Sequence, residues 1–403
     1  MHLALNNKYL NNSKIPILLL FNLAFYLVQF QYENVNYLWL FSNFFISIFI
    51  LKNLFIFSKK LLPIYFFVLL ALFSSFFYIN FKISSFLLTI FLVSTSCFHL
   101  IFLSKHLSLD KLNSILIIIF YVFLFVYFVQ IICVLLNIPI FNGFGLTKGN
   151  TTIFRLNSLS PEPSMGSQLV LLIMYLVNTM NLLSKKKSFL FELFCISLIV
   201  LYGSVFGYLL LFIYLIVVHR LKYPIIFYLE LFLASVIVVY SLATTETLTR
   251  IYNLVSYIYT DFDIDNFASI EPSGSFRFYP ILFYFQNLNL FDFHYLFGFG
   301  PGSSSFFFND GLTQHGFRMD FDSNFQGGFL PSFFVDYGFI PTLLIIYFIL
   351  KNCLIKYNIF EYLFFLLLLT NTNFNTQLFW FCIFATFLTK ELIHNKLSIN
   401  SLI

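Results

Sequence analysis

The sequence has few charged residues. Asp, Glu, Lys and Arg make up 10% of its 403 residues, whereas an ordinary soluble domain carries about 25%. Hydrophobic residues make up 60% of the chain, and its mean hydropathy is +0.89. No soluble fold could bury this much Phe, Leu and Ile. The composition therefore predicts an all-α polytopic integral membrane protein, in which transmembrane helices form a bundle.

Cysteine is also sparse, and none lies in a long polar stretch. The cysteines fall in apolar segments at unrelated spacings: Cys97, Cys133, Cys195, Cys353 and Cys382. This arrangement gives neither a disulfide framework nor a CxxC metal site. The segment from Asp261 to Asn266 resembles the start of a calcium-binding loop, but Asn266 stands where that loop requires glycine. We expect no metal and no other cofactor.

About twelve apolar segments are expected to cross the membrane, because about 20 residues of helix span a hydrocarbon core of about 30 Å. They are residues 15–32, 35–51, 61–80, 83–104, 113–136, 165–184, 188–203, 205–218, 223–242, 329–350, 357–371 and 374–389. Residues 188–218 are interpreted as two short spans that turn near Gly203, Ser204 and Gly207. Residues 1–403 are predicted to form one membrane domain with two large loops, 137–164 and 242–328.

Lysine and arginine are distributed unevenly among the connections. Sixteen of the 22 lie in short connections or near the termini, as Lys185–Lys187 do. Basic residues concentrate in the short loops that face the cytoplasm. Both termini are therefore predicted to be cytoplasmic, and both large loops lie on the opposite side. The formal net charge of +5 reflects this topology, so nucleic acid is not expected as a partner.

Most arginines depart from this rule. Four of the five lie in the two large loops: Arg155, Arg250, Arg277 and Arg318. A planar, permanently charged guanidinium group binds phosphate and carboxylate through paired hydrogen bonds. The pattern indicates an anion site on the outer face. Three alternatives remain: a salt bridge within the loop for Arg155, an interfacial anchor for Arg277, and simple solvation for Arg250 and Arg318.

A carboxylate and a helix start follow Arg155 closely. The segment from Arg155 to Ser164 contains Glu162-Pro163 and leads into an apolar stretch. Proline disfavours helical geometry in the residue before it, so Ser164 is predicted to be the N-cap. Arg155 and Glu162 are then expected at the outer mouth of this helix, where a helix N-terminus favours an anion.

Several other titratable residues are candidates for proton transfer or for membrane function. Asp336 is expected in the outer half of its span, and acidic residues within a membrane are functional candidates. His294 and His315 are the histidines of the large loops, and either could transfer a proton. Glu192 and Glu361 lie near the inner ends of their spans, where their side chains can extend to water.

The second large loop is rich in aromatic residues. Residues 276–297 mix aromatic with polar side chains, which predicts helical segments lying at the membrane interface. Gly298-Phe-Gly300-Pro-Gly302 comes next. Its backbone N–H groups could bind a phosphate, or the segment could simply form a turn.

Three sequence stretches resemble the bacterial O-antigen polymerase family. Ten residues separate Arg155 from Gly166, which is similar to the Arg-x10-Gly pattern of that family. The second stretch, Ser275-Phe-Arg277 with Phe297-Gly298-Phe-Gly300, is similar to the start of the motif in the family's second large loop. The third, Asn324 with Asp336-Tyr-Gly338, is similar to the place where that loop leads into the next span. The O-antigen ligases are a more distant resemblance. Ser323-Asn324 stands where ligases have His-Asn, which disfavours the ligase interpretation.

The resemblance implies a glycosyltransferase that polymerises undecaprenyl-pyrophosphate-linked repeat units into O-antigen or capsular polysaccharide. The reaction would occur at the periplasmic face of the bacterial inner membrane. Implied partners are the lipid-linked glycans, the lipid bilayer, a chain-length regulator and a flippase. The implied pyrophosphate ligands are Arg155, Arg277, Arg250 and Arg318, and the candidate bases are Glu162, Asp336 and His315.

Two alternative functions remain open at this point. One is an O-antigen-ligase-like transferase, which moves glycan to another acceptor. The other is a polysaccharide flippase or transporter, which is expected to carry its charges within the bundle at mid-membrane. The charges here are concentrated in an outer loop, 242–328, so the polymerase is the favoured function.

Overall fold

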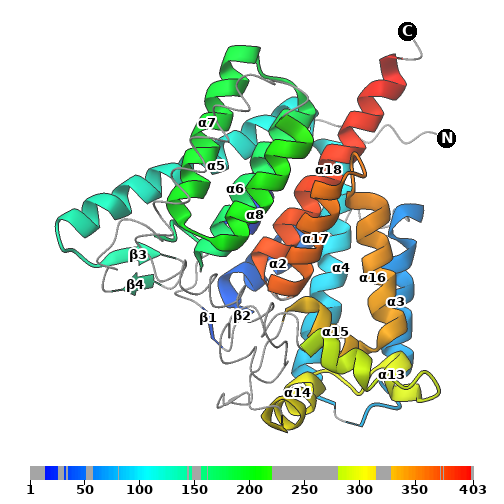
Figure 1. The fold of residues 1–403 in the computed structure, drawn as a ribbon. Helices are drawn as coiled ribbons and strands as arrows, with labels where there is room; N and C mark the ends of the chain where they lie inside the picture. The colour runs from blue at the N-terminus through cyan, green and yellow to red at the C-terminus, as the bar shows by residue number, and fades with distance from the viewer. Residues whose placement is uncertain are drawn as a thin grey trace. The chain divides into compact units, whose positions relative to one another are not determined.

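The computed structural model describes residues 14–25, 31–32, 35–50, 58–79, 81–142, 145–147, 156–160, 162–219, 280–314, 328–372, 374 and 376–400. These residues are mainly helical, with two short antiparallel hairpins (Figure 1). The predicted all-α class is therefore confirmed. The chain divides into two compact units, and each unit is assembled from segments that are far apart in the sequence.

The first unit comprises residues 1–58, 95–207 and 380–403. Its helices are α1 (Lys14–Ala24), α2 (Tyr37–Ile50), the second half of α4 (Ile83–His106), α5 (Leu109–Leu135), α6 (Pro163–Met180), α7 (Lys185–Tyr202) and most of α18 (Gln377–Asn400). Its hairpins pair β1 (Gln31–Tyr32) with β2 (Val35–Asn36), and β3 (Ile140–Asn142) with β4 (Gly145–Thr147).

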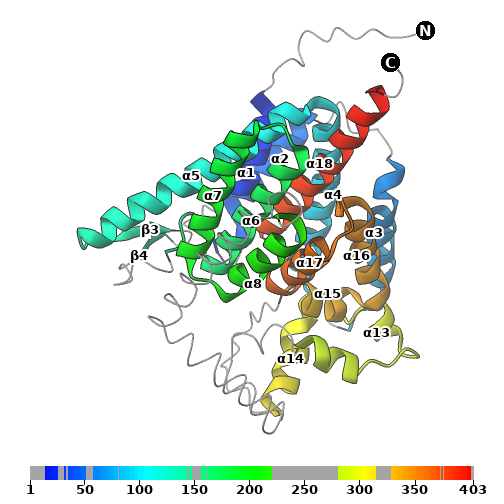
Figure 2. The ribbon, with the colours of Figure 1, turned by 45° about the horizontal axis from the view of Figure 1, so that its top comes forward.

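Helix α6 forms the core of the first unit. It contacts α5 and α7, and α7 lies alongside it in both ribbon views (Figures 1 and 2). All residues from Gly166 to Val177 are buried. Pro163 occupies the first turn, where its missing N–H is not needed. The helix ends at Asn181, whose left-handed φ of 50° closes the last turn.

The second unit comprises residues 59–94 and 208–379. Its elements are η3 (Lys59–Leu61), α3 (Leu62–Ser74), the first half of α4, most of α8 (Val205–Tyr214), the π-helical turn η4 (Leu215–His219), α13 (Phe293–Phe297), α14 (Ser303–Gln314), α15 (Phe329–Tyr337), α16 (Phe339–Cys353) and α17 (Ile359–Asn371). Residues 280–286 are also helical.

Helices α3 and α16 lie side by side in the second unit (Figure 2). Helix α13 contacts α3, α15 and α16. Aromatic side chains fill the space between α3 and α15: the Phe67 ring lies 6.0 Å from that of Phe333 and 5.5 Å from that of Tyr337. Such pairs of buried rings dominate core packing, and they hold α15 against α3.

The helices agree with the predicted spans in part. Among the described residues, α4 and α5 are long and apolar enough to cross a membrane. Other apolar helices in this part of the chain are shorter: Ile15–Ala24, Tyr37–Ile48, Phe206–Val217, Phe339–Cys353 and Ile359–Asn371. Residues 188–218 are divided near Gly203, as predicted, into α7 and α8, and the π-helical turn η4 continues α8. Gly203 ends α7 with a left-handed φ of 62°, a conformation that glycine adopts without strain.

The predicted single span over 329–350 is wrong. The structure divides it into α15 and α16 at Gly338, whose φ is 85°. A β-carbon at Gly338 would lie 2.4 Å from the backbone N of Gly298. The break therefore arises where the loop around Gly298 comes against the helix backbone, a contact between segments that are distant in sequence.

Two acidic side chains that could extend to water are buried instead. The Glu361 carboxylate is folded back onto its own connection and accepts hydrogen bonds from the N–H groups of Ile355, Lys356 and Tyr357 at 2.8–3.1 Å. Glu192 is 1% exposed and accepts a hydrogen bond from the Asn178 side chain. The possible extension to water is not adopted, because hydrogen-bond donors within the protein hold both carboxylates inside.

Candidate active site

The end of the first large loop is attached to α5 by buried hydrogen bonds. The Gln130 side chain donates to the Ser158 carbonyl oxygen and accepts from the Ser158 N–H, each at 2.8 Å. The Ser158 hydroxyl donates to the Phe123 carbonyl oxygen at 2.7 Å. Ser158 has a φ of 51°, which is uncommon for a residue other than glycine. These bonds hold residues 156–160 in one conformation.

The same loop packs tightly against α6 and α7. The Ser160 hydroxyl donates to the carbonyl oxygens of Asn157 and Glu162, at 2.8 and 2.7 Å. A β-carbon at Gly166 would lie 2.8 Å from Ser160 Oγ and 2.9 Å from Tyr202 Cζ. Gly166 is the glycine of the Arg-x10-Gly pattern. Its presence thus has a packing reason here, because a larger residue would push the loop away from α6.

Glu162 is the N-cap residue of α6, and its side chain is exposed. The prediction that Ser164 is the N-cap was wrong, because Pro163 is already helical. The Glu162 carboxylate makes no capping hydrogen bond; it accepts one from the Ser164 hydroxyl at 3.1 Å. Two features therefore meet here: an exposed carboxylate, which can accept a proton, and a helix N-terminus that Glu162 leaves uncapped and that favours an anion.

The arginines and one histidine of the predicted site lie outside the described residues. These are Arg155, Arg250, Arg277, Arg318 and His315. Arg155 immediately precedes Leu156, the first described residue of the fixed loop, and Leu156 is buried. The anion-binding roles of these arginines stay predictions. The structure describes the carboxylates Glu162 and Asp336, in the first and second units respectively.

Asp336 has a structural role beside its predicted chemical one. One oxygen of its carboxylate, Oδ1, accepts the Ser304 N–H at 2.8 Å in the first turn of α14. An acceptor at that position satisfies a helix N–H that would otherwise lack a partner. The half-buried carboxylate is therefore engaged in holding α14 against α15. Its role as a base stays a prediction.

The glycine-rich segment before α14 is bound to its neighbours through its backbone. Phe299 N–H donates to the Val335 carbonyl oxygen at 2.9 Å, and Gly300 N–H donates to that of Asp336 at 3.1 Å. Gly298, Gly300 and Gly302 all have positive φ. Because these N–H groups donate to carbonyl oxygens of the protein, the hydrogen bonds favour a simple turn over a phosphate-binding loop.

The short helix α13 holds His294 close to the same turn. Its ring stacks on Phe299 at 5.7 Å, and its backbone N–H donates to Asp292 Oδ1 at 2.9 Å. His294 Nδ1 is buried and has no hydrogen-bond partner in the described part of the chain. Burial raises the pKa of the neighbouring Tyr295 hydroxyl, and the Asp292 carboxylate raises that pKa further. His294 is thus placed by packing, and its role in proton transfer stays a prediction.

Two residues that position the loop before Glu162, Gln130 and Tyr202, were not predicted from the sequence. Gln130 lies 28 positions before Ser158 and looks like an ordinary polar residue in an apolar helix. Tyr202 contacts the loop from the end of α7 and its ring is fully buried. A polar residue inside an apolar span was the available signal for Gln130, because such residues usually have a specific partner.

The described residues contain no group of three or more His, Cys, Asp or Glu side chains that could hold a metal ion. No protein-family model matches the chain. No curated protein is significantly similar to it in sequence. Function is therefore inferred from the geometry around Glu162 and from the motifs of the two loops.

Proposed function

We propose that this chain is a polytopic membrane glycosyltransferase that polymerises undecaprenyl-pyrophosphate-linked repeat units into O-antigen or capsular polysaccharide. The observation that carries the proposal is the exposed Glu162 carboxylate at the N-terminus of α6, on a loop that buried hydrogen bonds hold in place directly after Arg155. The resemblance to O-antigen polymerases supplies the reaction. The geometry supplies a carboxylate at the position that the motif marks.

The exposed face of α5 supports a membrane location. Large apolar side chains recur on it every three or four residues: Ile118, Tyr121, Phe125, Phe128, Ile132 and Leu135 are all exposed. At about 1.5 Å per residue, this helix is about 40 Å long. A soluble monomer rarely exposes so long an apolar face, and lipid would cover it.

The proposed topology has about twelve spans, with α16 in place of the predicted span 329–350. Both termini lie in the cytoplasm and both large loops in the periplasm of a bacterial inner membrane. Several of the helices are shorter than a full span. Short spans are tolerated in a bundle where neighbouring helices satisfy their backbone groups. Substrates that carry long lipid chains would then reach Glu162 laterally, from the outer leaflet.

The proposed reaction joins two lipid-linked glycans. A hydroxyl group at the non-reducing end of one unit attacks the anomeric carbon of the other glycan. The bond from that carbon to the pyrophosphate oxygen breaks, and undecaprenyl pyrophosphate leaves. Glu162 accepts the hydroxyl proton as a general base. Arg155, Arg277, Arg250 and Arg318, together with the partial positive charge of the α6 N-terminus, stabilise the charge on the leaving group.

The test is polymerisation by the purified protein, reconstituted with lipid-linked repeat units. Glu162→Gln keeps the shape of the side chain but cannot accept the proton, so the rate should fall by about 10²–10⁴-fold, as for other losses of acid–base catalysis. Asp110→Asn is the matched control, because Asp110 is an exposed carboxylate in the first turn of α5. It should polymerise normally.

Two results would contradict the proposal. Near-normal rates for Glu162→Gln would remove the base and leave Asp336 and His315 as candidates. Transfer of whole glycans to a different acceptor, without longer chains on undecaprenyl pyrophosphate, would identify a ligase-like enzyme instead.

A further inference from the structure

The second unit carries an exposed apolar rim at the end of α3. We define the rim as four residues from two turns: Phe76 and Ile79 after α3, and Leu290 and Phe291 before α13. Phe291 is 100% exposed and Phe76 is 86% exposed. The two turns touch each other, since the rings of Phe77 and Phe293 lie 5.2 Å apart in an edge-on contact. Side chains this exposed contribute nothing to the protein's own core.

The rim continues an apolar stripe that runs the length of α3. Leu62, Phe66, Leu69 and Phe73 are all exposed, and their spacing of three or four residues places them on one face of the helix. Phe76 is the next position in this series. The stripe and the rim therefore form one continuous apolar surface within the second unit.

Helix α3 alone is too short to cross a bilayer. Its 13 residues extend about 20 Å, whereas the hydrocarbon core is about 30 Å thick. A hydrophobic helix that is shorter than the hydrocarbon core has a free-energy cost, and the residues that flank the helix can reduce this cost. The rim lies where α3 ends, so it adds apolar surface at the end where the helix falls short.

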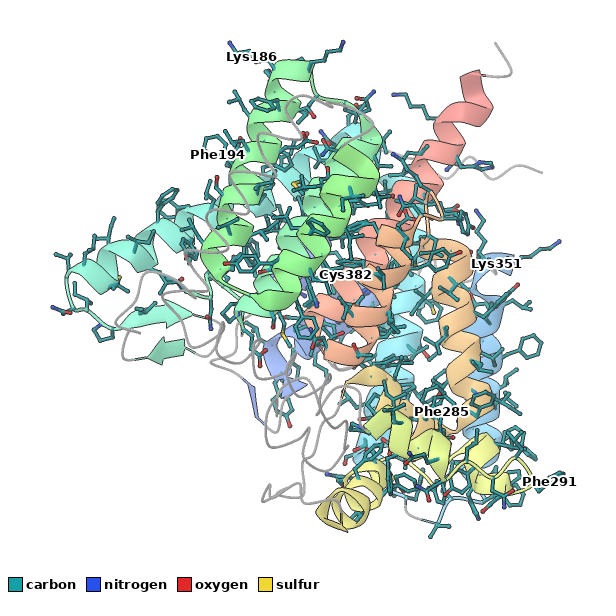
Figure 3. All side chains as sticks on the ribbon, in the orientation of Figure 1. Lys186, Phe194, Phe285, Phe291, Lys351 and Cys382 are labelled. Atoms are coloured by element: carbon teal, nitrogen blue, oxygen red, sulfur yellow. The ribbon has the colours of Figure 1, made fainter. Side chains whose placement is uncertain are left out.

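The other end of the stripe is basic. Lys59 and Lys60 precede α3, and Lys351 lies in the last turn of α16, where its ammonium group donates to the Tyr347 hydroxyl at 3.0 Å. Figure 3 shows Lys351 and Phe291 at opposite ends of α16. Lysines are enriched on the cytoplasmic side of a membrane, and tyrosines are enriched at its interfaces with water. This end of the stripe is therefore assigned to the cytoplasmic interface. The rim would then lie at the other boundary.

We propose that the rim inserts into the outer leaflet of the lipid bilayer and completes the membrane-facing surface of the short α3–α16 pair. This inference rests on the membrane location in the proposed function. It deepens that location: Phe76 and Ile79 follow α3 but belong to the predicted span 61–80, and Leu290 and Phe291 would join them in lipid. The exposed polar residues beside the rim, Asn287 and Asn289, would lie among the lipid headgroups.

The test is the depth of nitroxide spin labels in vesicles of phosphatidylethanolamine and phosphatidylglycerol. Cys97, Cys195, Cys353 and Cys382 are buried, so a Cys133→Ala background suffices. Labels at Phe291→Cys, Leu69→Cys and Lys186→Cys are compared by their collision rates with oxygen and with a water-soluble nickel chelate. Phe291 is fully exposed, so its substitution leaves the fold intact.

Oxygen collisions should exceed nickel collisions at positions 291 and 69, with the deeper label at 69. The reverse is expected at position 186, in the basic first turn of α7. Lipid contact at 69 with water contact at 291 would overturn the rim proposal and leave the membrane location standing. Water contact at both positions would overturn both. Lipid contact at 291 with water contact at 69 would overturn the proposal that the rim completes the membrane-facing surface of α3.

Discussion

The replacement Gln130→Met tests whether the loop before Glu162 is held by α5. Methionine has nearly the length of glutamine but makes neither of the two hydrogen bonds to Ser158. The Ser158 N–H and carbonyl groups would stay buried without a partner, since Ser158 is 0% exposed. Each unsatisfied buried group costs about 1–3 kcal/mol. We therefore expect a destabilisation of about 2–6 kcal/mol for the two groups together.

The assay is thermal unfolding of the purified protein in detergent, followed with a maleimide dye that becomes fluorescent on reacting with exposed cysteines. Four of the five cysteines are buried and report unfolding. The apparent melting temperature of Gln130→Met should be clearly lower than that of the parent protein. Its polymerisation rate should fall as well, because Glu162 follows the released loop.

The matched control is Gln168→Met in α6. Gln168 is also a buried glutamine in an apolar helix, but neither its amide N nor its amide O has a hydrogen-bond partner in the described structure. Its replacement should leave the melting temperature unchanged or raise it, because an unpaired buried amide is removed. Equal melting temperatures for the two variants would show that the two Gln130 hydrogen bonds do not stabilise the protein.

Three further predictions concern single side chains. Glu361→Gln should destabilise the protein by about 2–4 kcal/mol, since hydrogen bonds to a charged acceptor contribute about 1.5–3 kcal/mol each; an unchanged melting temperature would contradict it. Gly166→Ala should lower the melting temperature because the alanine β-carbon would contact Ser160 and Tyr202, which outweighs the about 0.5–1 kcal/mol by which alanine favours a helix over glycine. A raised melting temperature would show that the contact relaxes. Arg277→Lys should stop polymerisation at a single repeat unit on a gel, since lysine cannot bind phosphate with two parallel bonds; a full ladder would exclude that role.

Local sequence was sufficient for the helical class and for several helix boundaries. The apolar composition predicted helices, and Gly203 predicted the break between α7 and α8. Pro163 marked the start of α6 to within two residues. These features depend on backbone preferences and on neighbours a few positions away, which the sequence displays directly. The motif around Glu162 is also local, since its residues are close together in the chain, and its catalytic role stays a prediction.

Tertiary structure decided how the polar groups are paired. Asp336 holds the start of α14, and Gln130 holds Ser158; in both cases the partner lies about 30 positions away and no periodicity indicates it. The break at Gly338 exists because Gly298 approaches its backbone. Even the nearby pairing of Glu361 required Tyr357 to adopt a φ of 53°. A buried polar group must find a partner, but which partner it finds depends on which segments the packed helices bring together.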